Sequence, residues 1–92
     1  EEFAVVLPDT DDAGATVIAE KIRKAVSEIT LPSPDIVVTA SLGIAVYPAH
    51  ASTTERLERL ADAALYTAKR SGRNRTEIAV IEERSPTAGV SL

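Results

Sequence analysis

The segment from residue 54 to 71 most constrains the fold, because its apolar residues recur every three or four positions and then stop at a glycine. This spacing is the period of a helix with one apolar face. Gly72 follows where a helix favours a left-handed residue. The apolar stripe comprises Leu57, Leu60, Ala61, Ala64, Leu65 and Ala68. The sequence therefore predicts a helix that is capped by a hydroxyl residue at 52–54 and ends near Ser71.

A second helix is predicted from Ala13 to Ile29, where apolar residues have the same period. Thr10, Asp11 and Asp12 precede it and are suitable N-caps. Its predicted apolar face comprises Ala15, Ile18, Ala19, Ile22, Ala25, Val26 and Ile29. Both helices would need a common core to cover these faces.

Three strands are predicted around the helices. Residues 2–7 are almost all apolar, which is typical of a strand buried on both faces, and Pro8 ends it. Residues 37–47 alternate between a large apolar face and a small face of Thr39, Ser41, Gly43 and Ala45. Such a face allows close approach by a helix or a ligand, and helix packing is the simpler interpretation. Residues 75–81 form a closing strand with Ile78 and Val80 on one face.

The order strand, helix, strand, helix, strand is typical of the α/β class. At 92 residues the chain is one domain at most, and we expect it to cover residues 1–81, with residues 82–92 as a flexible tail or linker. A net charge of −4 argues against nonspecific nucleic-acid binding. The chain has no cysteine, and no apolar run approaches the roughly 20 residues of a membrane span.

Two groups of charged residues are candidates for chemistry. Glu1 and Glu2 stand at the start of the first strand, where they could bind a hard cation or form an ordinary solvated strand end. Lys69 and Arg73 are four residues apart, which in a helix places them on one side of its C-terminal end. They could bind phosphate or complement the helix dipole. His50 lacks a second metal ligand, and we expect it at the surface.

Four blocks together indicate a family. In order they read EEFAVVLPDTD, AEKIRKAV, VTASLGIAVYP and DAALYTAKRSGRNR. In this order and spacing they resemble the C-terminal portion of a GGDEF domain, the diguanylate cyclase family, starting within its GG[DE]EF motif. The resemblance runs from Glu1 to about Ile81 and implies a partial nucleotidyl-cyclase-like α+β sandwich that lacks its N-terminal half.

The resemblance also implies roles for the candidate residues. Glu1 matches a metal ligand and candidate general base, and Glu2 matches a second glutamate needed for metal-dependent activity. Lys69 and Arg73 match the pair that holds the triphosphate of GTP, whereas Arg70 and Arg75 have no such match and are expected to be solvated. The implied cofactor is Mg²⁺ or Mn²⁺.

The family's reaction condenses two GTP molecules into cyclic di-GMP and two pyrophosphates across a homodimer. The family's other metal ligand and its guanine-binding residues would precede Glu1, so this segment is expected to be inactive alone and to associate through exposed sheet edges. The longer protein is expected to be the enzyme, with an upstream sensory or regulatory domain. We expect the segment to be cytoplasmic and without membrane contact, although the parent could be membrane-anchored. The alternatives are a degenerate GGDEF module that binds GTP or a partner and regulates a neighbouring domain, and a plain dimerisation domain.

Overall fold

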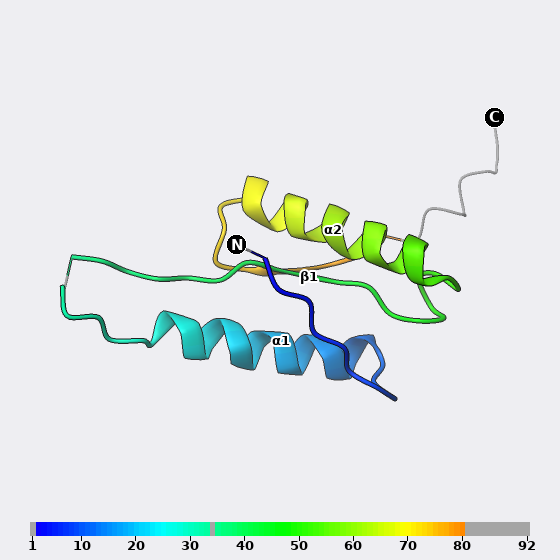
Figure 1. The fold of residues 1–92 in the computed structure, drawn as a ribbon, viewed down its shortest axis with the longest axis horizontal. Helices are drawn as coiled ribbons and strands as arrows, with labels where there is room; N and C mark the ends of the chain where they lie inside the picture. The colour runs from blue at the N-terminus through cyan, green and yellow to red at the C-terminus, as the bar shows by residue number, and fades with distance from the viewer. Residues whose placement is uncertain (1, 34, 81–92) are drawn as a thin grey trace.

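The fold is a small parallel sheet between two helices. The computed structural model describes residues 2–33 and 35–80, whose elements in chain order are α1 (Asp12–Ser27), β1 (Leu42–Ile44), α2 (Thr54–Arg70) and β2 (Thr76–Ile78). The two strands are parallel, with Leu42 opposite Thr76 and Ile44 opposite Ile78. Each helix contacts both strands, and the helices lie on opposite sides of the sheet (Figure 1). The mixed helix-and-sheet architecture confirms the expected fold class.

Both helices begin at predicted capping residues. Asp11 caps α1, and its carboxylate accepts a hydrogen bond from the backbone N–H of Gly14 at 2.8 Å. Thr53 caps α2, and its hydroxyl accepts from the backbone N–H of Arg56 at 3.2 Å. These bonds satisfy helix N–H groups that have no carbonyl partner within the helix, which explains why local sequence located both starts well.

The core on the α1 side confirms the large apolar face predicted for residues 37–47. Ala15 and Ala19 of α1 are buried against Ile44 and Val46, and Leu7 packs against the same cluster. Small side chains on the helix allow the larger strand side chains to fill the space between them. The outer part of the predicted helix face is less buried, since Ile22 and Ile29 are 37% and 53% exposed.

The small face of β1 is where α2 approaches most closely. A Cβ atom added at Gly43 would overlap the backbone carbonyl of Ala61 and the backbone nitrogen of Leu65. The helix backbone therefore occupies the space that a side chain would need. This contact confirms that the small face serves helix packing.

Two of the predicted strands are wrong in extent. Residues 2–7 form no strand, and Phe3 and Val6 are 88% and 84% exposed. Of residues 37–47 only Leu42–Ile44 is a strand, and Val37 is 77% exposed. A strand needs a neighbour to accept and donate its backbone hydrogen bonds, and within the described residues only β1 and β2 pair with each other. The expected burial of residues 2–7 on both faces is therefore wrong as well, because an apolar composition does not supply a pairing partner.

The closing strand also differs from the prediction. It spans only Thr76–Ile78, and the residue that enters the core is Ala79, which is 8% exposed. Ile78 and Val80 are 36% and 78% exposed. The predicted tail at 82–92 lies outside the described residues. Within the part of the chain that the structure covers, no helix is both long and apolar enough to cross a membrane.

His50 is buried, which contradicts its expected surface position. Only 6% of it is exposed, and its Nδ1 accepts a hydrogen bond from the backbone N–H of Val46 at 2.8 Å. The backbone N–H of His50 in turn donates to the carbonyl of Val46 at 2.7 Å. The imidazole therefore satisfies a buried backbone donor in the loop that connects β1 to α2.

An ion pair on α1 continues into a hydrogen bond with the loop before β2. The guanidinium of Arg23 donates to Glu20 at 2.8 Å and to the side-chain oxygen of Asn74 at 2.9 Å. The hydrogen bond from Arg23 is the main reason that the pKa of Glu20 lies below its ordinary value of 4.5. Ionised Glu20 thus helps to hold Arg23 toward the loop.

Replacing Gly43 by alanine is expected to lower the free energy of unfolding by about 1–3 kcal/mol or more, because α2 must move away from β1. The matched control is Gly14→Ala, whose added Cβ would meet only side-chain atoms of Thr10 and Asp11 at 3.1 and 3.2 Å. We expect the control to change the free energy by less than about 1 kcal/mol. Urea unfolding followed by circular dichroism measures both, and equal effects would contradict the close approach.

Acid is expected to remove the contribution of Glu20 to stability. Because the folded-state pKa is lowered, this contribution is present above the ordinary value of 4.5 and is lost as the pH falls through the folded pKa. The native chain should therefore unfold at higher urea than Glu20→Gln near neutral pH, and the two midpoints should converge in acid. A difference that stays constant from neutral pH to below 4.5 would refute this assignment.

Candidate functional site

Two of the predicted site residues meet although 67 positions separate them in the sequence. The ammonium Nζ of Lys69, in the last turn of α2, lies 3.1 Å from a carboxylate oxygen of Glu2. Their side chains are 37% and 59% exposed, so the pair remains open to solvent. One anionic and one cationic candidate thus share a single place on the surface.

A hollow of about 260 Å³ surrounds this ion pair. It is lined by Glu2 and by four residues of α2, namely Asp62, Leu65, Tyr66 and Lys69. Leu65, Tyr66 and Lys69 lie three, four and seven positions after Asp62, so the four residues share one face of the helix. The hollow therefore combines two carboxylates, one ammonium and an aromatic ring.

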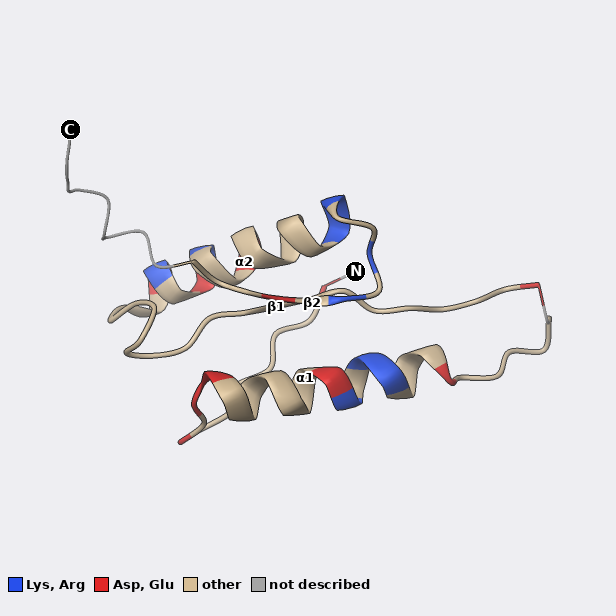
Figure 2. Ribbon diagram, turned by 180° about the vertical axis from the view of Figure 1, so that it is seen from behind, with Lys and Arg blue, Asp and Glu red and all other residues tan. Residues whose placement is uncertain are grey.

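The C-terminal end of α2 gathers cations, as Figure 2 shows in blue at the helix end and along the following loop. The helix ends at Arg70, and the backbone N–H of Arg73 donates to the carbonyl of Ala68 at 2.9 Å. This is the longer hydrogen bond of a Schellman motif, in which the residue after the cap is left-handed. Gly72 occupies that position with φ of 122°, which confirms it as the stop signal.

The geometric argument that paired Lys69 with Arg73 is wrong. That argument required both residues to be helical, but Arg73 lies beyond the helix and has φ of 63°. Asn74 is also left-handed, with φ of 49°. The position of Arg73 is therefore set by a left-handed turn, and the helical period does not determine it.

Arg70 is exposed, as expected, but it is engaged with a neighbour. Its guanidinium donates to the hydroxyl of Tyr66 at 3.1 Å and lies 5.6 Å from the centre of the Tyr66 ring. Both residues are on the outer surface of α2, one turn apart. Arg70 therefore orients a side chain that lines the hollow.

The described residues offer few carboxylates that could bind a metal ion at this site. Among residues 2–33 and 35–80 no group of three or more His, Asp or Glu side chains is arranged to hold a metal ion. Glu1, the other predicted ligand, lies outside these residues. The exposed carboxylate of Glu2 fits a site in which the protein supplies one or two carboxylates and the remaining ligands are substrate phosphate and water.

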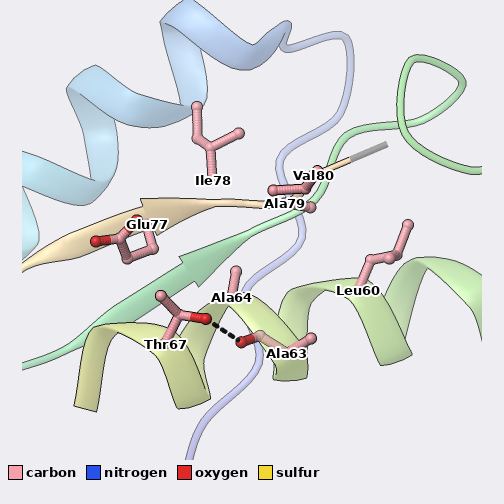
Figure 3. Close-up of a pocket in the computed structure, with 8 residues that line it drawn as sticks. All are labelled: Leu60, Ala63, Ala64, Thr67, Glu77, Ile78, Ala79 and Val80. Carbon is pink, nitrogen blue, oxygen red and sulfur yellow. Dashed lines mark hydrogen bonds between the residues drawn. The ribbon is translucent and has the colours of Figure 1, made fainter. Parts of the chain in front are cut away.

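A second hollow, of about 160 Å³, lies between α2 and residues 77–80, at and just after the end of β2 (Figure 3). Its lining residues are Leu60, Ala63, Ala64, Thr67, Glu77, Ile78, Ala79 and Val80. The hydroxyl of Thr67 donates to the carbonyl of Ala63 at 3.1 Å, which is the dashed line in Figure 3. Since this hydroxyl already has a partner and most other lining residues are apolar, this hollow offers little for catalysis.

Sequence reasoning missed the partners of the site residues. Asp62 and Tyr66 could have been found from their helical spacing to Lys69. Arg23 and Asn74 could not, because their hydrogen bond joins residues 51 positions apart in the sequence.

Comparison with known proteins agrees with the motifs. The sequence profile described as "Diguanylate cyclase, GGDEF domain" matches residues 1–75. The chain is 40% identical over 82 residues to "Probable diguanylate cyclase DgcT" of Escherichia coli strain K12, which covers 85% of this chain and 18% of that protein. It is 39% identical over 80 residues to "Diguanylate cyclase A" of Treponema denticola, which covers 85% of this chain and 22% of that protein.

Another relative has no activity in its name. "Uncharacterized protein YhcK" of Bacillus subtilis strain 168 is 49% identical over 78 residues, which cover 82% of this chain and 22% of that protein. The chain thus spans about a fifth of the length of these relatives, which are much longer proteins. Because the profile matches residues 1–75, which is most of the chain, the chain belongs to the GGDEF family of diguanylate cyclase domains.

Proposed function

We propose that this chain is part of a diguanylate cyclase, an enzyme that condenses two GTP molecules into cyclic di-GMP and two pyrophosphates. The observation that carries the proposal is the meeting of Glu2 and Lys69 in one exposed hollow. Relatives named as diguanylate cyclases match most of the chain. The complete activity is assigned to the longer protein.

The proposed chemistry depends on position and charge. The 3′-hydroxyl of one GTP attacks the α-phosphorus of another, and pyrophosphate leaves. Lys69 and Arg73 neutralise the charge that builds on the leaving pyrophosphate. Glu1 would help to hold the metal ion and would accept the proton of the attacking hydroxyl. Two such sites face each other across a homodimer, so each subunit presents one nucleotide.

The family is generally metal-dependent, and Mg²⁺ or Mn²⁺ is the proposed ion. Glu1 and Glu2 would hold it, and the ion would supply a positive charge that polarises the phosphate oxygens. A hard cation of this kind accepts one or two carboxylates and retains phosphate and water ligands. The hollow beside Glu2 has room for such a group, at about 260 Å³.

The Glu2–Lys69 ion pair supports a simple account of how the two groups are held before they bind ligands. Each side chain neutralises the charge of the other. In the proposed complex the carboxylate of Glu2 would help to hold the metal ion, and the ammonium of Lys69 would bind phosphate. Because the exposed pair contributes only about 0.2–1 kcal/mol, this exchange costs little.

The first test is to incubate the full-length protein with GTP and Mg²⁺ and to measure cyclic di-GMP by chromatography. Lys69→Ala is expected to weaken GTP binding about tenfold or more, because a charged hydrogen-bond donor is lost. Lys24→Ala is the matched control, since Lys24 is an exposed lysine in the last turn of α1 and removes the same charge. We expect this control to bind GTP normally.

Three outcomes separate the alternatives. The cyclase assignment is supported if the native protein forms cyclic di-GMP, Glu1→Gln forms none and Lys69→Ala forms less. If the protein folds, dimerises and binds GTP in a magnesium-dependent way but forms no cyclic di-GMP, the cyclase assignment is wrong. The chain would then belong to a regulatory GTP-binding module. Equal GTP affinity in the native protein and in Lys69→Ala would contradict the role given to the hollow.

A second prediction concerns the exchange of partners at Glu2. Without metal, Glu2→Gln is expected to tighten the binding of inorganic pyrophosphate by up to about fivefold, because the carboxylate no longer competes for Lys69. With Mg²⁺ the same substitution should weaken binding. Isothermal titration calorimetry measures both. The gain in pyrophosphate affinity without metal must vanish when Lys69→Ala is combined with Glu2→Gln. Weaker pyrophosphate binding by Glu2→Gln without metal would refute the exchange.

A further inference from the structure

The turn that carries Arg73 is unusually well fixed for an exposed loop. Arg73 and Asn74 both have positive φ, at 63° and 49°, a conformation that non-glycine residues adopt rarely. Such backbone persists only where surrounding contacts hold it. The contacts in this case come from outside the loop, and they converge on Asn74.

Asn74 is held from two directions. Its side-chain oxygen accepts a hydrogen bond from Arg23 of α1 at 2.9 Å, and its backbone N–H donates to the hydroxyl of Ser41 at 3.1 Å. The acceptor must be the oxygen, since a guanidinium only donates. The next residue is fixed as well, because the carbonyl of Arg75 accepts from the backbone N–H of Leu42 at 2.9 Å.

Arg23 is itself restrained, so it can act as a fixed point. Its guanidinium makes hydrogen bonds to both carboxylate oxygens of Glu20, between 2.8 and 3.1 Å, and its side chain is only 26% exposed. The planar fork binds Glu20 through Nε and Nη2, and Nη1 donates to Asn74. A chain of contacts therefore runs from α1 through Asn74 to the backbone of Arg73.

We propose that Arg23 and Asn74 are positioning residues, which hold the left-handed turn so that Arg73 presents its guanidinium to the polyphosphate chain of the nucleotide. The inference rests on the proposed function, because it takes Arg73 as a phosphate ligand. It adds that α1, which contributes no residue to the hollow beside Lys69, sets the geometry of that ligand from the other side of the sheet. Loss of the clamp leaves the charge of Arg73 in place but removes its orientation.

The test measures binding of 3′-deoxy-GTP, which lacks the attacking hydroxyl, to the full-length protein with Mg²⁺. Asn74→Gly tolerates the left-handed backbone but removes the hydrogen bond to Arg23, and it is expected to weaken binding about three- to tenfold. Asn74→Asp also tolerates this backbone and offers an oxygen to Arg23, so it should bind within about twofold of the native protein.

A double-mutant cycle separates positioning from stability. In the Arg73→Ala background, Asn74→Gly should change the dissociation constant by less than about twofold, because there is no guanidinium left to orient. Arg23→Lys provides a second variant, since it keeps the charge and loses the planar fork. It should weaken nucleotide binding when Arg73 is present and have little effect in the Arg73→Ala background. Arg59→Ala, an exposed position on α2, is the surface-charge control and should have no effect.

The outcomes distinguish a failure of the positioning role from a failure of the proposed function. If Arg73→Ala weakens binding but Asn74→Gly and Arg23→Lys do not, the positioning role is wrong and the proposed function stands. If Asn74→Gly weakens binding equally with and without Arg73, its role is only structural. If the native protein does not bind the nucleotide at all, the proposed function and this inference both fall.

Discussion

The close approach of α2 to β1 at Gly43 is the contact on which the rest of the structure depends. It places the helix backbone directly on the strand, so α2 is fixed in both distance and direction. Lys69 lies about one turn beyond Leu65 and about two turns beyond Ala61, the residues that meet Gly43, and its position follows from that docking. A side chain at Gly43 would push the whole helix, and with it the hollow, away from the sheet.

The pairing of β1 with β2 also positions the loop that carries Arg73. β2 pairs with β1 in a single register, which fixes where the loop after α2 must end. The Schellman motif and the left-handed turn span the distance between the end of α2 and the start of β2. The cations at this end therefore lie on a short segment that is anchored at both ends, although the segment itself is exposed to solvent.

Local sequence patterns predicted some elements accurately and failed for others. Asp11 and Thr53 were correctly expected to be within the capping positions, and Gly72 was correctly taken as the stop, because caps and left-handed residues act over only a few positions. The strand predicted at 2–7 is absent and the strand predicted at 37–47 is reduced to Leu42–Ile44, because a strand requires a partner that the local pattern does not contain. His50 was misplaced for a related reason, since its burial follows from the fold of the loop around Val46.

By itself, the sequence determined the two helices with their ends, the division of β1 into a large and a small face, and the family to which the chain belongs. These features are encoded by residues within a few positions of one another or by ordered motifs. Only the tertiary structure decided that Glu2 meets Lys69 and that Arg23 holds Asn74, across 67 and 51 residues of sequence. Such contacts depend on how helices pack on a sheet, because packing brings together side chains that no local period relates.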